Sequence, residues 1–361
     1  MSKILIFFPG NIAPYQIDRL NELAKLGVEF EVIQVPVEQH YRPWTDKDRN
    51  YNGYKVSELG MSDLSLPLST EVGSYLAKEL PNLVLIYGYV KSMRTVAICC
   101  KDANIKVGIF VDTWRPIDKI FYKEWFKKYF LKKYTLFSIT PGFRQRHYLT
   151  TLGYKNRCIF TSPLSCNKGF IENGIPRVKN NNYFLTICRF SEEKNLFHLL
   201  ESYRDYLDKG GSKRLKLVGA GPLESDLNIL VKKNNLRSFV EFVNWSSPEE
   251  LKKVYQDAYC FILVSLHEPW GVVVNEAISS GLPIIASDKC GCVGELVRDG
   301  VNGIVVTGFN KSETALAMIN MEINRYNHKR YSQNSLQLGL LYSSKNSALS
   351  LSKVMSSYAK L

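Results

Sequence analysis

Short apolar runs alternate with helix-length amphipathic segments along most of the chain, and no other feature of the sequence restricts the fold as much. The runs have the length of buried strands, and the segments between them have the length of helices. In the first half the expected strands are residues 3–8, 30–35, 83–87, 106–111, 135–139 and 158–160. The expected helices between them are residues 15–26, 71–80, 93–102, 117–133 and 143–152. This order predicts parallel sheets that carry helices on both faces.

The alternation stops once, in residues 162–182, and then begins again. The interruption holds two prolines, two glycines and a polar run, which are typical of a linker between domains. After it, strands are expected at residues 183–188, 215–218, 240–243, 259–264, 283–286 and 303–306. We therefore predict an α/β protein with two Rossmann-like, doubly wound domains, residues 1–165 and 166–340, that face each other across a cleft.

Composition narrows the class of partner. The 361 residues include 47 basic and 34 acidic side chains, so the formal net charge is +13. Such an excess favours an anionic partner, which can be a nucleic acid, an anionic membrane surface or a phosphorylated substrate. No basic run resembles a nucleic-acid-binding motif, so we expect no nucleic acid.

The cysteines, histidines and apolar windows exclude several other classes. The eight cysteines and five histidines have no metal-ligand spacing, so neither a metal site nor a disulfide framework is expected. The first apolar run is too short for a signal peptide, and no window approaches the roughly 20 apolar residues of a membrane-spanning helix. We expect a cytoplasmic protein, which can still be peripheral on the cytoplasmic face of a membrane.

The stretch from Glu268 to Glu276 is the richest in possible chemistry. Glu268 follows the expected strand 259–264, and Glu276 lies in a helix that is expected to begin near Gly271. The N–H groups at the start of a helix form a seat for phosphate. The two carboxylates flank this seat and can accept hydrogen bonds from sugar hydroxyls. The stretch suggests a nucleotide-sugar site, although a pair of glutamates alone is more often a solvated face.

Together with a Gly-Leu-Pro turn at 281–283 and an Asp-Gly-Val-Asn-Gly run at 299–303, this stretch resembles the donor-binding half of family 4 retaining glycosyltransferases, with their E-x7-E motif. The resemblance covers the last half of the chain well and the first half loosely. It implies the GT-B fold, a nucleoside diphosphate sugar as donor substrate, and neither a metal ion nor an organic cofactor. It also implies that the last helix, in residues 341–361, packs back on the N-terminal domain.

The resemblance further implies a role for each residue around the phosphate seat. Glu276 would bind the ribose hydroxyls, and Glu268 would lie beside the hydroxyls of the transferred sugar. The N–H groups of Gly271, Val272 and Val273 would meet the β-phosphate.

Two further pairs follow strands of the second half. Arg189 and Lys194 have the family's Arg-x4-Lys spacing, and the resemblance implies that they contact the donor phosphates. Two cations at this place can balance the charge that builds on a departing nucleoside diphosphate, whereas the alternative is a pair of solvated charges. Gly219 and Gly221 form a Gly-x-Gly-Pro turn that the family has near the donor phosphates or base. A plain tight turn explains these glycines almost as well.

The first half offers fewer candidates. Gly10 and Asn11 lie in the loop after the first strand, where a glycine permits close backbone approach. The resemblance implies that this loop reaches the sugar and phosphate, and a structural turn is the equal alternative. Asp112 follows the strand 106–111 and can orient or deprotonate an acceptor hydroxyl. A helix cap or an ion pair with Arg115 is the alternative for Asp112.

Residues 117–134 mix lysines and aromatic residues with only two acidic ones, Asp118 and Glu124. This is the composition of a helix that lies on an anionic membrane surface. The alternative, which we favour, is a helix that packs its aromatic residues on a sheet and turns its lysines to water. A membrane contact would make a lipid-linked saccharide the expected acceptor.

These observations lead us to expect a retaining glycosyltransferase that moves a sugar from a nucleoside diphosphate to an acceptor hydroxyl. The acceptor would be a saccharide or lipid-linked saccharide in polysaccharide or glycoconjugate synthesis. One alternative is a nucleotide-sugar epimerase or hydrolase of the same fold, and another is a non-catalytic binder of a membrane surface. The sequence specifies neither the sugar, the nucleotide, the acceptor nor the oligomeric state.

Overall fold

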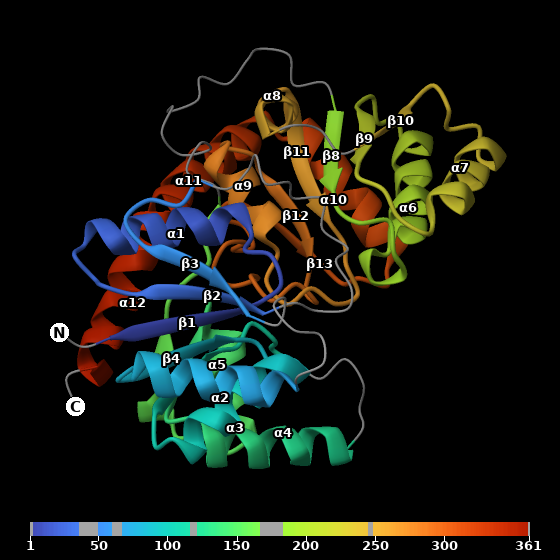
Figure 1. Ribbon diagram of the computed structural model, residues 1–361. Coiled ribbons are helices and arrows are strands. Elements are labelled where there is room, and N and C mark those ends of the chain that lie inside the picture. Colours follow the sequence, from blue (N-terminus) through green and yellow to red (C-terminus); the bar gives the residue numbers. More distant parts are fainter. Residues whose placement is uncertain are drawn as a thin grey trace. The chain divides into compact units, whose positions relative to one another are not determined.

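A computed structural model describes residues 3–35, 50–59, 67–115, 121–166, 183–244 and 248–359 (Figure 1). The chain divides into two compact units. Unit 1 comprises Met1–Ser165 and Ser344–Leu361, and unit 2 comprises Cys166–Ser343. Most of the expected linker, from residue 167 to residue 182, lies outside the described residues.

Unit 1 is built on a parallel sheet with the strand order β3-β2-β1-β4-β5-β6-β7. Its strands are β1 (Ile4–Pro9), β2 (Glu31–Val35), β3 (Lys55–Glu58), β4 (Leu83–Tyr87), β5 (Lys106–Phe110), β6 (Phe137–Thr140) and β7 (Ile159–Thr161). Its helices are α1 (Pro14–Lys25), α2 (Leu68–Glu79), α3 (Lys91–Asp102), α4 (Phe121–Tyr134), α5 (Phe143–Thr151) and α12 (Ser344–Ala359).

Consecutive side chains of β1 enter two different cores. Leu5 and Phe7 pack with residues of α3 and α5. Ile6 and Phe8 pack with residues of α1 and α12. Side chains of a strand alternate between the faces of a sheet, so this arrangement requires an apolar residue at every position. The continuous apolar run of β1 therefore follows from helices that cover both faces.

The last helix of the chain belongs to unit 1. The hydroxyl of Ser347 in α12 donates to the carbonyl of Pro163 at 2.5 Å, and the hydroxyl of Ser162 donates to the carbonyl of Ser347 at 3.0 Å. The ring of Tyr358 stacks on Phe137 of β6 with 4.1 Å between the ring centroids. The chain thus closes the core of unit 1 with residues that follow unit 2 in the sequence.

Unit 2 is built on a second parallel sheet, with the order β10-β9-β8-β11-β12-β13. Its strands are β8 (Tyr183–Ile187), β9 (Arg214–Val218), β10 (Val240–Val243), β11 (Ala258–Leu263), β12 (Ile284–Ser287) and β13 (Gly303–Val306). Its helices are α6 (Leu196–Asp208), α7 (Glu224–Lys233), α8 (Pro248–Gln256), α9 (Val272–Ser279), α10 (Lys311–Ile323) and α11 (Arg325–Leu341).

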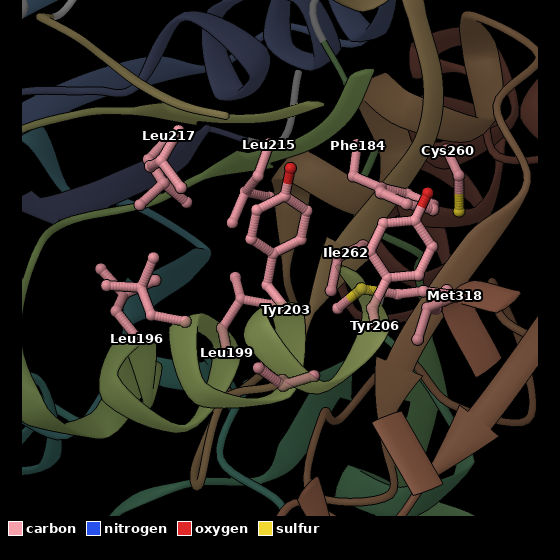
Figure 2. Close-up of a cluster of buried hydrophobic side chains, with 14 of the residues drawn as sticks. Phe184, Leu196, Leu199, Tyr203, Tyr206, Leu215, Leu217, Cys260, Ile262 and Met318 are labelled. Carbon is pink, nitrogen blue, oxygen red and sulfur yellow. The ribbon is translucent and has the colours of Figure 1, made fainter. Parts of the chain in front are cut away.

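One core of unit 2 lies between the sheet and helices α6 and α10. Tyr203 and Tyr206 of α6 point into it with fully buried rings, and Met318 comes from α10 (Figure 2). The hydroxyl of Tyr203 donates to the carbonyl of Lys213 at 2.9 Å. The opposite face carries α9, which contacts β11 and β12. Both units are thus parallel sheets of the Rossmann type, which confirms the predicted α/β class.

Two features differ from the expected elements. β3 was not expected, because its sequence Lys-Val-Ser-Glu is short, polar and lies at the edge of the sheet. The favoured expectation for residues 117–134 is wrong for four aromatic side chains. Helix α4 lies beside α3 (Figure 1), but these four side chains are not covered. Phe130 is buried, whereas Tyr122, Trp125, Phe126 and Tyr129 are exposed. Residues 117–120 lie outside the described part.

Among the described residues, no helix is both long enough and apolar enough to cross a membrane. All eight cysteines lie in the described part, and none of them is in a disulfide.

Candidate functional site

Two loops of unit 2 that follow neighbouring strands are tied together by hydrogen bonds. β8 and β11 pair in parallel, so the loop after each one leaves the same edge of the sheet. The backbone N–H of Leu266 donates to the carbonyl of Glu193 across 2.8 Å. The Asn195 side chain, at the start of α6, donates to the carbonyls of Val264 at 3.2 Å and Gly308 at 2.8 Å. These contacts hold the loop after β8 against the loop after β11 and against the segment that follows β13.

The same loops bring together two of the predicted site residues, Lys194 and Glu268. Nζ of Lys194 lies 2.6 Å from Oε2 of Glu268, and the two side chains are only 16% and 13% exposed. Burial lowers the pKa of Lys194, but the nearby carboxylate outweighs burial and the pKa of Lys194 is raised. The ammonium group therefore stays charged beside the carboxylate at neutral pH.

The backbone on either side of Glu268 is fixed by a third loop, after β12. The N–H of Glu268 donates to the carbonyl of Lys289 at 3.3 Å, and the N–H of Gly291 donates to the carbonyl of Glu268 at 2.8 Å. Glu268 and Cys290 therefore form an isolated parallel β-bridge. The Glu268 side chain therefore projects from a backbone that is held on both sides.

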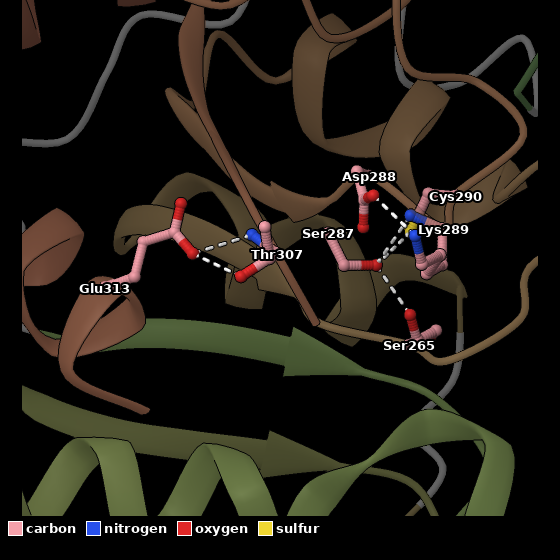
Figure 3. A network of polar contacts seen from close by, with 7 residues as sticks. All are labelled: Ser265, Ser287, Asp288, Lys289, Cys290, Thr307 and Glu313. Atoms are coloured by element: carbon pink, nitrogen blue, oxygen red, sulfur yellow. Dashed lines mark hydrogen bonds and ion pairs between the residues drawn. The ribbon is translucent and has the colours of Figure 1, made fainter. Parts of the chain in front are cut away.

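Figure 3 shows the polar contacts that support this third loop. The Ser287 hydroxyl donates to the carbonyl of Ser265 at 2.5 Å, which joins the ends of β12 and β11. It also accepts from the N–H of Lys289 at 3.3 Å. Nζ of Lys289 lies 2.6 Å from the Asp288 carboxylate. The hydroxyl of Ser287 thus ties the end of β12 to the end of β11 and supports the start of the loop that holds Glu268.

Helix α9 begins directly after the Glu268 loop, as the sequence predicts. Gly271 has φ of +99°, a conformation that an L side chain rarely adopts, and Val272 is the first helical residue. A Cβ placed on Gly271 would lie 3.4 Å from Cγ of Glu268, so the helix start and this side chain are neighbours. The first N–H groups of a helix have no partner within it, so the N–H groups of Val272 and Val273 point outward beside Glu268.

Glu276 lies farther along α9 and is held by a tyrosine from α8. The single O–H of Tyr255 is shared between Oε2 of Glu276 at 2.7 Å and the carbonyl of Val273 at 3.2 Å. Tyr255 is fully buried, while Glu276 is surrounded by protein but retains some exposure. Burial raises the pKa of Glu276 to about 7, although the Tyr255 hydrogen bond acts in the opposite direction. The carboxyl group therefore titrates near neutral pH.

Arg189 is exposed and lies in the same loop as Lys194. The pKa of Glu193 lies below its usual value, although burial alone would raise it. Hydrogen bonds from Ser191 and the backbone lower this pKa. The charges of Lys194 and Arg189 lower it further. The loop after β8 thus carries two cations, of which Lys194 is in direct contact with Glu268 and Arg189 is near Glu193.

Gly219 and Gly221 have a structural reason to be glycine. Gly219 has φ of +141°, and a Cβ on it would lie 2.0 Å from the carbonyl oxygen of Cys188. A Cβ on Gly221 would lie 2.4 Å from the carbonyl oxygen of Phe190. The turn after β9 therefore packs directly on the backbone that flanks Arg189. Contact of these glycines with a donor remains a prediction.

Three predicted site residues belong to unit 1. Gly10 has φ of +71°, and its N–H donates to the carbonyl of Val35 at 2.7 Å, as a turn after β1 requires. Asn11 is exposed beside it. Asp112 is exposed directly after β5, and its charge acts on Lys127, whose pKa burial lowers. The guanidinium of Arg115 lies over the Trp114 ring, 4.9 Å from its centroid.

Sequence reasoning missed Tyr255, Asn195 and Ser287 as parts of this site. Each acts through a hydrogen bond to a distant segment, and no local pattern marks such a bond. A hollow of about 600 Å³ lies elsewhere in unit 2, beside β13, α10 and α11. None of the predicted site residues lines it.

Residues 167–337 match the family model described as Glycosyl transferases group 1. The matched segment contains Arg189, Lys194, Glu268 and Glu276, and it lies entirely in unit 2. The matched segment therefore includes the ion pair and the start of α9.

Curated relatives match about a third of this chain. An uncharacterized glycosyltransferase of Methanocaldococcus jannaschii is 29% identical over 131 residues, which are 36% of this chain and 33% of the relative. The amylovoran biosynthesis glycosyltransferase AmsK of Erwinia amylovora is 30% identical over 125 residues, or 33% of this chain and 30% of the relative. Alpha-D-kanosaminyltransferase of Streptomyces kanamyceticus is 29% identical over 134 residues, or 37% and 34%. This chain spans about a third of the length of the curated relatives it matches.

Solved structures resemble the whole chain in fold. Anabaena HepE in complex with UDP has a TM-score of 0.80 at 14% identity, over 99% of this chain and 100% of that chain. Sucrose-phosphate synthase from Thermosynechococcus elongatus has a TM-score of 0.75 at 15% identity, over 99% of both chains. At these identities the likeness establishes the fold, which is GT-B.

Proposed function

We propose that this chain is a family 4 retaining glycosyltransferase that transfers a sugar from a nucleoside diphosphate sugar to an acceptor hydroxyl. The acceptor is a saccharide or lipid-linked saccharide in polysaccharide or glycoconjugate synthesis. Support comes from the family match over residues 167–337 and from relatives such as AmsK, whose name refers to amylovoran biosynthesis. A structural neighbour, HepE, has been solved in complex with UDP-glucose.

The observation that carries the proposal is the contact between Lys194 and Glu268 beside the start of α9. A diphosphate seated on the N–H groups of Val272 and Val273 would lie against a charged ammonium group. The helix dipole and Lys194, with Arg189 nearby, would stabilise the negative charge that grows on the diphosphate as it leaves. Glu268 would accept hydrogen bonds from the hydroxyls of the sugar while it positions Lys194.

Glu276 is suited to the ribose. Two neighbouring hydroxyls can both donate to one carboxylate, and Tyr255 already fixes the direction of one carboxyl oxygen. Because the first turn of α9 is held by the same phenol through the carbonyl of Val273, ribose binding and phosphate binding depend on one rigid element.

Retention would follow from attack on the same face of the sugar from which the diphosphate leaves. The acceptor oxygen forms the new bond to the anomeric carbon as the bond to the β-phosphate breaks, and a phosphate oxygen takes the acceptor proton. A double displacement would need a carboxylate as nucleophile. The ion pair with Lys194 makes Glu268 a poor nucleophile for such a displacement. Asp112 would orient the acceptor hydroxyl.

The test is slow donor hydrolysis with a panel of nucleoside diphosphate sugars, followed by NMR. We expect one donor to release its sugar as the α anomer, and Glu276→Ala to abolish the release. Glu201→Ala is the matched control, because Glu201 is a partly exposed glutamate of unit 2 that pairs with Lys311. Release of the β anomer would contradict retention, and a changed sugar without transfer would indicate an epimerase. If calorimetry also detects no binding of any nucleotide or nucleotide sugar, the proposal fails.

A further inference from the structure

Helix α4 presents two faces with different surroundings. Phe130 and Leu131 are buried, and Lys127 and Tyr134 beside them are half-buried. These four positions have the spacing i, i+3, i+4, i+7 that defines one side of a helix. This side packs on unit 1, and α3 lies next to it (Figure 1).

A second set with the same spacing lies on another side of the helix. Tyr122, Trp125, Phe126 and Tyr129 are 67%, 60%, 47% and 45% exposed, and together they form what we call the aromatic face of α4. The rings of Trp125 and Tyr129 are nearly parallel, with 6.0 Å between their centroids. Four exposed aromatic side chains on one helix side are unusual for a surface that contacts only water.

Charge on this helix is distributed unevenly. Lys123, Lys128, Lys132 and Lys133 are all exposed. Glu124, the acidic residue of α4, is instead engaged with the protein, because it accepts a hydrogen bond from Oη of Tyr148 at 2.5 Å. The exposed positions of α4 thus combine aromatic rings and ammonium groups, and no carboxylate is among them in the described helix.

We propose that the aromatic face of α4 binds the surface of a membrane that contains anionic lipids, with the helix lying parallel to that surface. Tyr and Trp rings have an apolar body and a polar edge, which suits the boundary between head groups and acyl chains. The lysines beside them attract anionic head groups, and their long stems reach around the rings. The formal net charge of +13 acts in the same direction at longer range.

The charge pattern favours lipid over other partners. A protein partner would need an acidic surface that also accommodates four aromatic rings, whereas an anionic bilayer offers both properties everywhere. The absence of a membrane-spanning helix among the described residues agrees with binding at the surface. The proposal concerns binding alone and stands or falls independently of the proposed transfer reaction.

The test is sedimentation of the full chain with vesicles of phosphatidylcholine alone and with vesicles that also contain phosphatidylglycerol. We expect binding to the anionic vesicles that weakens as NaCl is added. The variant Lys128→Gln/Lys132→Gln/Lys133→Gln should lower the partition coefficient at least about tenfold, because each lysine near an anionic surface contributes a several-fold factor. The variant Tyr122→Gln/Trp125→Gln/Tyr129→Gln should lose binding to a similar degree.

Matched controls lie in unit 2. Tyr326→Gln removes an aromatic residue that is 76% exposed, and Lys232→Gln/Lys233→Gln removes two exposed lysines of α7. Both control variants should bind like the wild type. Because the substituted residues are exposed, thermal melting should show that all variants remain folded.

Four outcomes would overturn the proposal. In the first, the full chain does not bind anionic vesicles. In the second, the aromatic variant binds them as well as the wild type does. In the third, the control variants lose as much binding as the α4 variants. If the aromatic variant instead abolishes a concentration-dependent dimer seen without vesicles, the aromatic face contacts a second copy of the chain and the membrane assignment is wrong.

Discussion

The single O–H of Tyr255 is shared between two acceptors, Oε2 of Glu276 at 2.7 Å and the carbonyl of Val273 at 3.2 Å. One fully buried side chain of α8 therefore fixes both a predicted ligand of the donor and the first turn of the helix that would hold the diphosphate. This arrangement links the ribose and phosphate parts of the candidate site through a residue that would touch neither.

Tyr255→Phe should therefore weaken donor binding without removing any group that contacts the donor. The substitution leaves a carboxyl oxygen of Glu276 without its partner, which should cost about 1–3 kcal/mol in the free energy of unfolding. Denaturant unfolding and nucleotide calorimetry would measure the two effects. Tyr203→Phe is the control, because it removes a buried phenol whose bond to Lys213 lies in the core of unit 2. Equal losses of affinity in both variants would show that only stability is affected.

The pKa of Glu276 predicts how donor binding depends on pH. Burial raises this pKa to about 7, whereas hydrogen bonds from two ribose hydroxyls would favour the ionised carboxylate. As the pH falls through about 7, the carboxyl group of the free protein takes up a proton that binding must release. Affinity for the nucleoside diphosphate should therefore fall by up to about tenfold for each pH unit below 7.

Calorimetry in buffers with different ionisation enthalpies would detect this proton release directly. Glu276→Gln should bind weakly and without the pH dependence. If the dependence persists in Glu276→Gln, another group controls the pH dependence of binding.

The sequence was sufficient to predict the parallel α/β class, because strands buried on both faces are continuous apolar runs such as that of β1. It also placed Glu268 in a loop and Glu276 in a helix that begins after Gly271. It did not predict the partners that hold these carboxylates. Lys194 and Tyr255 come from other elements, and their positions follow from the pairing of β8 with β11 and from the packing of α8.

The error at α4 has a different cause. The sequence of α4 contains two sets of residues with helical spacing. One set includes Phe130 and Leu131, and the other is the aromatic face. The sequence is therefore compatible with burial of either set. Only the packing of Phe130 and Leu131 decides which set is buried.

The contact between Lys194 and Glu268 should be energetically coupled. Glu268→Gln or Lys194→Met each leaves one partner partly buried without its counter-charge, so each should cost roughly 1–3 kcal/mol of stability and most of the donor affinity. The double variant should lose less than the sum of the two, with a coupling energy of about 1 kcal/mol or more. A double-mutant cycle by urea unfolding would measure it.

The pair Lys216 and Glu241 provides the control cycle. Its atoms are 3.3 Å apart, but Glu241 is 54% exposed, so solvent screens the interaction. Coupling there should lie between about 0 and 1 kcal/mol. Coupling of the same size in both cycles would contradict a special role for the pair at the start of α9.

Gly219→Ala should damage the loop that carries Arg189 and Lys194. The φ of Gly219, +141°, disfavours any L side chain. The added Cβ would lie 2.0 Å from the carbonyl oxygen of Cys188, so the turn after β9 must move.

Gly210→Ala is the matched control, because Gly210 has φ of +88° and no atom within 4 Å of an added Cβ. The control should lose about 1 kcal/mol from backbone strain alone, whereas Gly219→Ala should lose at least about 2–3 kcal/mol and its donor affinity. Thermal unfolding and nucleotide calorimetry on both variants would measure the difference. Equal losses would mean that the turn adapts and that Gly219 is needed only for its backbone conformation.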